Sequence, residues 1–336
     1  MVSSSQTSTV SRPSQEPQSP LQETLTGSSS QEQAESSIAP SPGIPDQPGT
    51  STTESTSLLG PLVKTEDGSF TVQDRITGEC YHTRMGARRE AEELYIKLSG
   101  FHDALARLPA TCINVLDVGL GLGYNAASTL EAWLRAPCPP SVLMVSLENN
   151  VEVIQSLLKM NAPWTQTWDT RALRALATMT PSGPGQWSCR LSHPSSKGDD
   201  RESLEGSTTN PVFVWEIFAL DAVSEPLPYA RESAPTEKAP PQRYPLAKNP
   251  GETSFFWDFV WQDPFSPDRN PAMWSSHWFK KLRQQCHPDT RVLTYSVARR
   301  VRDALEEAGF TWEKRPTPFP MKKHWLYATP QPASSL

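Results

Sequence analysis

The sequence predicts an α/β fold in which a mostly parallel sheet carries helices on both faces. Three observations lead to this prediction. Short apolar segments alternate with segments of helical periodicity between residues 111 and 330. A glycine-rich turn joins the first of these apolar segments to a helix, and polar turns separate the later ones. Strands that alternate with helices form parallel sheets, because each crossover helix covers one face of the sheet.

The N-terminal third divides into a tail and a small structured segment. Residues 1–60 are rich in Ser, Thr, Gln, Pro and Glu and contain no aromatic residue, so they cannot bury enough apolar surface to fold. We therefore expect a disordered tail. Residues 61–110 should hold a β-hairpin, with strands at 68–74 and 80–83, followed by one helix at 87–108.

Residues 111–330 form the predicted main domain. The expected helices are 125–134, 151–160, 275–286 and 299–308, and the expected strands are 113–118, 142–147, 212–220, 255–261, 291–297 and 324–328. Segments 180–210 and 224–253 are rich in Pro, Ser, Gly and charge, and they look like insertions. Loops this long are unusual inside a compact domain, and disordered loops are favoured over functional lids.

Charge is unevenly distributed along the chain. The net charge is −6, but residues 269–323 hold twelve Lys and Arg against five Asp and Glu. A basic segment of this kind either faces phosphates or forms ordinary solvated helix surfaces, and composition does not separate the two.

Targeting and metal signals are missing from the sequence pattern. The five cysteines are scattered, and no His/Cys cluster has the spacing of a zinc site, so we expect no metal and no disulfide framework. No apolar run approaches a membrane span, and the N-terminus does not read as a secretory signal. We therefore expect a cytoplasmic protein with no membrane partner.

The glycine-rich turn is the first candidate site. It runs Asp117-Val-Gly119-Leu-Gly121-Leu-Gly123-Tyr-Asn125, after an apolar strand and at the start of a helix. Glycines let the backbone turn sharply and approach a ligand closely, and a helix N-terminus offers N–H donors. A ligand at the carboxyl ends of the strands would bind here, although a tight strand–helix turn without a ligand has the same pattern.

The acidic residues at successive strand ends narrow the ligand class. Glu148 ends the second strand of the main domain, where it could accept hydrogen bonds from ribose hydroxyls, and Asp221 follows the third, near an adenine amino group. The glycine spacing differs from the dinucleotide fingerprint G-x-G-x-x-G, and no Gly-Lys-Ser/Thr motif follows. Three acids at strand ends, counting Asp117, suit adenosine better than a pyrophosphate.

This pattern resembles the Rossmann-like class I methyltransferases that depend on S-adenosyl-L-methionine (SAM), over roughly residues 112–330. The resemblance implies SAM as the cofactor. It also implies a set of cofactor-binding residues, namely Asp117, Gly119, Gly121, Gly123, Asn125, Glu148, Asp221 and Asp263.

A finer resemblance links four separated blocks to the methyltransferase part of the MnmC family. The blocks are the entry segment formed by residues 81–90 and 93–96, then residues 258–274, 308–310 and 320–326. That family acts in the biosynthesis of 5-methylaminomethyl-2-thiouridine at the tRNA wobble position. The resemblance therefore implies a tRNA substrate and methylation of an aminomethyl nitrogen.

The block around Asp263 implies the remaining site residues. Asp263 would hold or deprotonate the substrate amine. The alternative is that Asp263 only caps the turn before Pro264. Phe265 belongs with it at the catalytic site, and Phe265 and Trp274 would stack on a flipped base unless Trp274 is a core aromatic. Asn270 is expected at the substrate site, and Lys322 and Lys323 would contact tRNA phosphates.

The chain also departs from the family pattern. Bifunctional members carry a second, flavin-dependent oxidoreductase domain, and this sequence has no second glycine-rich loop, so a separate oxidoreductase would act in the same pathway. Two alternatives remain open, a SAM methyltransferase with a small-molecule or protein acceptor and a non-catalytic Rossmann-like interaction protein. An NAD-dependent oxidoreductase is disfavoured by the glycine spacing.

Overall fold

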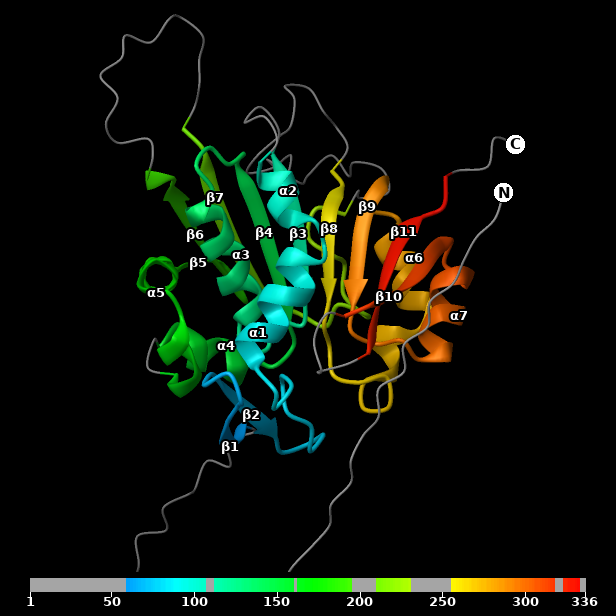
Figure 1. Cartoon of the computed structure of the whole chain (residues 1–336), viewed down its shortest axis with the longest axis horizontal. Helices are drawn as coiled ribbons and strands as arrows, with labels where there is room; N and C mark the ends of the chain where they lie inside the picture. The colour runs from blue at the N-terminus through cyan, green and yellow to red at the C-terminus, as the bar shows by residue number, and fades with distance from the viewer. Residues whose placement is uncertain are drawn as a thin grey trace, which may run out of the picture. The chain divides into compact units, whose positions relative to one another are not determined.

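The computed structural model describes residues 59–106, 112–159, 162–194, 210–230, 255–317 and 323–332 (Figure 1). These residues belong to one compact unit that runs from Ser55 to the C-terminus. The expected tail up to residue 58, residues 195–209 and 231–253 of the two expected insertions, and Lys322 lie outside the described residues.

In the described part of the chain, the central feature is a nine-stranded sheet with the order β10-β11-β9-β8-β3-β4-β7-β6-β5. The five strands from β9 to β7 are parallel, and antiparallel strands flank them on both sides. The strand bounds are β3 (Ile113–Val118), β4 (Val142–Glu148), β5 (Thr180–Gly183), β6 (Gln186–Ser192), β7 (Val212–Ala219), β8 (Trp257–Gln262), β9 (Cys286–Thr294), β10 (Phe310–Pro316) and β11 (His324–Pro330). The prediction of an α/β fold around a parallel sheet is confirmed.

Helices cover both faces of this sheet. Every residue of β3 and β4 is buried, as expected for central parallel strands that are covered on two sides. Alternate side chains enter two cores, so Val115 packs with the core under α3 while Leu116 packs with the core under α6 and α7. The first face carries α3 (Tyr124–Arg135), α4 (Val151–Leu158) and α5 (Thr170–Ala177), and the second carries α6 (Ser276–Arg283) and α7 (Arg299–Glu307). The 3-10 helices η2 (Pro163–Thr167) and η4 (Pro271–Trp274) lie in the connections.

The N-terminal hairpin exists, but with a different partner strand from the predicted one. It pairs β1 (Leu59–Lys64) with β2 (Phe70–Asp74), whereas the expected return strand at 80–83 makes only one isolated bridge, between Gln73 and Cys80. The Asp74 carboxylate accepts hydrogen bonds from the N–H groups of Ile76 and Thr77, and this side-chain turn ends the strand.

The expected single helix at 87–108 is divided into three pieces. They are α1 (Ala87–Glu90), the π-helix η1 (Ala91–Lys97) and α2 (Phe101–Leu105), with Gly100 in the left-handed conformation at the break. In Figure 1 these helices and α3 lie in front of the sheet.

Several edge elements were not predicted. Residues 180–192, which composition assigned to an insertion, form β5 and β6, and β6 pairs with β7 along its whole length. Strand β10 and helix α5 were also missed. Edge strands bury only one side, so their polar residues and prolines hide the apolar signal on which the prediction depends.

The order of the central strands creates a crevice beside β3. The chain passes from β3 to β4 and β7 on one side, and then returns to β8 on the other side of β3. Ligands of open α/β sheets bind at the carboxyl ends of the strands, where the strand order reverses in this way.

Candidate cofactor and substrate site

A cavity of about 700 Å³ lies at the carboxyl ends of β3, β4, β7 and β8. Its volume falls within the usual range of small-molecule sites. Segments distant in the sequence meet around it. The lining includes Asp74, Tyr81 and His82 from the N-terminal segment, Gly119, Gly121, Glu148 and Asn150 from the first half of the sheet, and Asp221, Asp263, Phe265, Arg269 and Asn270 from the second.

Two of the three glycines in the turn line the cavity. Gly119 has φ +86°, and a Cβ there would lie 3.0 Å from the carbonyl oxygen of Asp263. Gly121 has φ +49°, and its N–H donates to the Glu148 carboxylate at 2.9 Å. Gly123 is the N-cap of α3 and does not line the cavity, and a Cβ there would meet the Trp168 ring at 2.9 Å. The missing side chain of Gly123 lets the turn pack closely against Trp168 and Leu157.

The two acids predicted at later strand ends both face the cavity. Glu148 is buried and also accepts from the N–H of Asn150, and burial raises its pKa. Asp221 is exposed, and hydrogen bonds from the Ser224 hydroxyl and the Val223 N–H lower its pKa. The two carboxylates that the sequence predicted at these strand ends therefore line one cavity.

A lysine on α6 holds the loop that contains Asp221. The Lys281 ammonium group, on α6, donates to the carbonyl oxygens of Ala222 and Val223 at 2.7 and 3.1 Å. The loop therefore has a defined position before any ligand arrives.

Asp117 and Asn125 differ from their predicted roles, because neither lines the cavity. Asp117 is fully buried and accepts from the Ser146 hydroxyl at 2.9 Å, and burial raises its pKa to about 8. Asn125 is also buried and donates to the Asp263 carboxylate at 2.9 Å. Both residues support the site from behind.

Asp263 lies where β8 ends, beside the glycine turn. Its N–H donates to the carbonyl oxygen of Val118, which holds this end of β8 against β3. Burial raises the pKa of the Asp263 carboxyl to about 6, with a further increase from Glu90, and His82 and Asn125 act in the opposite direction. Burial therefore makes this carboxylate a stronger base than one exposed to solvent.

An aromatic pair stands beside Asp263. The Phe265 ring lies 4.8 Å from the Tyr81 ring, centroid to centroid, with an interplanar angle of 54°. Both rings line the cavity. Glu79 anchors the two loops to each other, because it accepts from the Ser266 N–H at 3.0 Å.

The residues expected at the substrate site are distributed differently. Asn270 lines the cavity. Trp274 does not stack in it, because the ring is only 3% exposed and its indole N–H donates to the Phe265 carbonyl oxygen. Trp274 is therefore a core aromatic that supports the Phe265 loop. Lys323 is exposed at the start of β11, outside the lining, and Lys322 lies outside the described residues.

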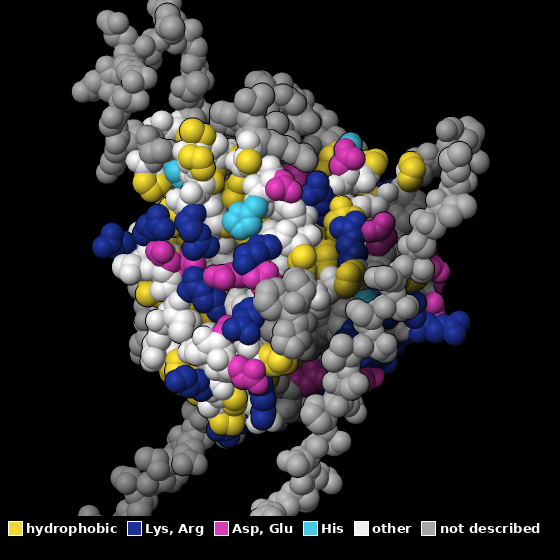
Figure 2. Space-filling model, in the orientation of Figure 1, with side chains coloured by type: hydrophobic (Ala, Val, Ile, Leu, Met, Phe, Trp, Pro, Cys, Tyr) yellow, Lys and Arg dark blue, Asp and Glu magenta, His cyan; other side chains and the backbone are white. Residues whose placement is uncertain are grey.

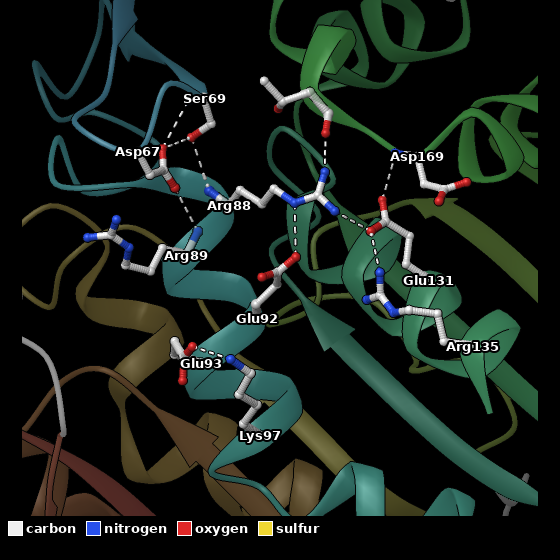
Figure 3. Close-up of polar contacts among 11 residues, drawn as sticks. Asp67, Ser69, Arg88, Arg89, Glu92, Glu93, Lys97, Glu131, Arg135 and Asp169 are labelled. Carbon is white, nitrogen blue, oxygen red and sulfur yellow. Dashed lines mark hydrogen bonds and ion pairs between the residues drawn. The ribbon is translucent and has the colours of Figure 1, made fainter.

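The face that carries α1 and α3 has no single sign of charge. Figure 2 shows Lys and Arg side chains interspersed with Asp and Glu across it. Arg88 explains part of this arrangement, since it binds Glu92, the Glu131 carboxylate and the Thr167 carbonyl oxygen (Figure 3). Arg88 is thus engaged within the protein, which weakens any role in phosphate binding.

Sequence reasoning missed Tyr81 and His82 as site residues. They follow the hairpin, more than 180 positions before Asp263, and nothing in their spacing connects them to the cavity. Only the family resemblance of residues 81–90 marked this segment.

Comparisons with known proteins find similarity to a methyltransferase family and to MnmC proteins. A family model described as S-adenosyl-L-methionine-dependent methyltransferase matches residues 248–331. The "tRNA 5-methylaminomethyl-2-thiouridine biosynthesis bifunctional protein MnmC" of Delftia acidovorans is 38% identical over 257 residues, covering 76% of this chain and 33% of the relative. The protein of the same name from Polaromonas naphthalenivorans is 29% identical over 259 residues, with the same coverage.

A solved structure has a similar fold. The crystal structure of MNMC2 from Aquifex aeolicus superposes with a TM-score of 0.55 at 20% identity, covering 84% of this chain and 74% of that one. The chain spans about a third of the length of the curated relatives that it matches.

Proposed function

We propose that this chain, which carries an MnmC-like SAM-dependent methyltransferase domain, methylates the aminomethyl nitrogen of a modified wobble uridine in tRNA. The product would be 5-methylaminomethyl-2-thiouridine, as the names of the relatives imply. Since the chain matches only a third of those relatives, the substrate is our proposal for this chain.

The charge of the cavity is the observation that carries the proposal. Its described lining includes five carboxylates and one arginine, Arg269. Both SAM, with its sulfonium, and an alkylammonium substrate are cations, so an acidic cavity favours both. The same charge disfavours a phosphate deep in the site, and phosphates would bind outside it.

The lining residues divide between the two ligands. When bound, SAM supplies an electrophilic methyl group. Glu148 is placed to accept from ribose hydroxyls and Asp221 from the adenine amino group, while Gly119 and Gly121 leave room for the approach. Asp263 accepts a hydrogen bond from the amine and keeps its nitrogen aligned with the methyl carbon, which is mainly a positioning effect.

A flipped base fits the aromatic pair beside Asp263. Tyr81 and Phe265 offer ring surfaces at the cavity, and single-stranded RNA readers stack bases on such rings. We assign phosphate contacts to basic residues outside the lining, with Lys322 and Lys323 as candidates.

The proposal extends to location and partners. We propose that the reaction takes place in the cytoplasm and that a flavin-dependent oxidoreductase acts in the same pathway. Among the described residues, no helix is long and apolar enough to cross a membrane, and no cluster of His, Cys, Asp and Glu could hold a metal ion.

The test is a methylation assay with radiolabelled SAM and tRNA from cells blocked at the aminomethyl stage. Label should appear as 5-methylaminomethyl-2-thiouridine after nucleoside analysis. The Asp263→Asn variant serves as the matched negative control. If wild-type protein binds SAM by calorimetry yet labels no tRNA, the acceptor is a small molecule or a protein instead.

A further inference from the structure

His82 is a buried histidine at the cavity that the roles assigned above leave unused. Its side chain lines the cavity although the residue is only 6% exposed. Neither ring nitrogen has a hydrogen bond within the described residues. The ring packs edge-on against Tyr124, with centroids 5.1 Å apart. A buried polar ring without partners in a ligand cavity is costly unless a ligand or function compensates.

Glu90 lies beside this ring. One carboxylate oxygen of Glu90 is 3.7 Å from Nδ1 of His82, and the same oxygen accepts from the Thr83 N–H at 3.0 Å. Glu90 is itself only 7% exposed. Since Nδ1 faces the carboxylate, Nε2 is the ring nitrogen without a partner among the described residues, and it lies buried just beneath the cavity surface.

The helix that carries Glu90 is held firmly. Asp67 accepts from the Arg89 N–H at 2.9 Å at the start of α1, and Arg88 ties α1 to α3 through Glu131 (Figure 3). Glu131 in turn accepts from the Asp169 N–H at 2.8 Å. The Glu90 carboxylate therefore keeps a fixed position relative to His82.

We propose that His82, backed by Glu90, takes the proton that the substrate amine loses, while Asp263 holds the amine in place. The inference rests on the proposed function. An alkylammonium loses one proton to Nε2, and its nitrogen lone pair then forms the bond to the methyl carbon. The carbon–sulfur bond breaks, its electron pair stays on sulfur, and the product is a secondary ammonium. The proton on His82 passes to water after product release.

The surroundings favour this division of roles. The Asp263 carboxylate already accepts from Asn125, whereas Nε2 of His82 has no hydrogen bond within the described residues. The Glu90 carboxylate lies 3.7 Å from Nδ1 of His82, and Asp263 lines the same cavity as His82. This is the arrangement of a base oriented by a carboxylate. The titratable groups that face His82 are Glu90 on α1, Tyr124 on α3 and Asp263 after β8. Tyr95 on η1 and Tyr295 after β9 interact in turn with Glu90 and Asp263.

The test compares turnover of wild type and His82→Gln on tRNA between pH 6.5 and 9.5. A positioned base contributes about 10²-fold or more, so we expect a loss of about 100-fold at pH 7. An alkylamine resembles the lysine side chain, with a pKa of about 10. The deficit should therefore shrink to under about 10-fold at pH 9.5, where the free amine no longer needs a protein base.

Controls separate this inference from other outcomes. His277→Gln, at an exposed position on α6, should match wild type at every pH. Glu90→Gln should lose less turnover than His82→Gln, and its loss should likewise shrink as the pH rises. If His82→Gln does not fold or does not bind SAM, the Glu90→Gln variant tests the role of His82 in its place. A deficit that stays constant with pH, or none, overturns the role of His82. A wild-type protein inactive on tRNA overturns the proposed function instead.

Discussion

Gly119→Ala tests whether the glycine turn and the Asp263 loop need their close approach. An alanine at φ +86° costs about 1–2 kcal/mol in the left-handed conformation. Its Cβ would also lie 3.0 Å from the Asp263 carbonyl oxygen and 3.2 Å from the Pro264 Cα, and neither backbone atom can rotate away. Overpacking of this kind adds about 1–3 kcal/mol. The total expected loss in the free energy of unfolding is about 2–5 kcal/mol.

Gly309→Ala is the matched control for backbone strain. Gly309 has φ +80°, yet an added Cβ there meets no atom within 4 Å. Denaturant unfolding should therefore show a loss of about 1–2 kcal/mol for this variant. Calorimetry should show SAM affinity unchanged for Gly309→Ala and at least about 10-fold weaker for Gly119→Ala, a difference of about 1.4 kcal/mol. Equal stability losses in the two variants, with equal SAM affinity, would refute the reasoning.

Three further changes test the site. Gly121→Val should abolish SAM binding, because even an added Cβ would lie 3.1 Å from the Tyr81 ring. A SAM affinity within about threefold of wild type by calorimetry would show that the glycine turn is not part of the cofactor site. Asp263→Asn should keep SAM binding but lower turnover about 100-fold or more, and an unchanged rate would exclude Asp263 from the reaction. Asp117→Asn should change the pH dependence of stability. The folded pKa of Asp117, about 8, is raised above its ordinary value of 3.8, so its stabilisation is complete only below about pH 4 and is lost progressively as the pH rises to 8. Between pH 6 and 9 the wild type should lose up to about 3 kcal/mol more than Asp117→Asn in denaturant titrations, and parallel curves would contradict the buried-acid explanation.

The sequence predicted the centre of the fold well because its signals there are local. Strand β3 is an unbroken apolar run, the glycines follow it directly, and Glu148 ends the next strand. Parallel topology then brings these strand ends to one edge of the sheet. The cavity at that edge was therefore predictable from residues 113–148 together with Asp221 and Asp263.

The remainder depends on contacts between distant residues. Asn125 contacts Asp263 instead of a ligand because α3 packs beside the end of β8. The spacing of residues in the sequence does not reveal this packing. Trp274 is apolar and aromatic, so a stacking surface and a core position look the same in the sequence. His82 had no recognisable pattern, because its partner Glu90 and the cavity are assembled only by the fold.

The N-terminal segment has a consequence for how this domain could be re-engineered. The sheet supplies Glu148 and Asp221, while Tyr81 and His82 come from a segment whose side chains, among them Ala87, Tyr95 and Phe101, are buried in the same core as α3 and the sheet. Residues 59–106 are therefore an integral part of the domain and cannot be exchanged as a block without disturbing that core. A redesign of the acceptor side should keep these buried contacts and change only side chains that line the cavity, such as Tyr81.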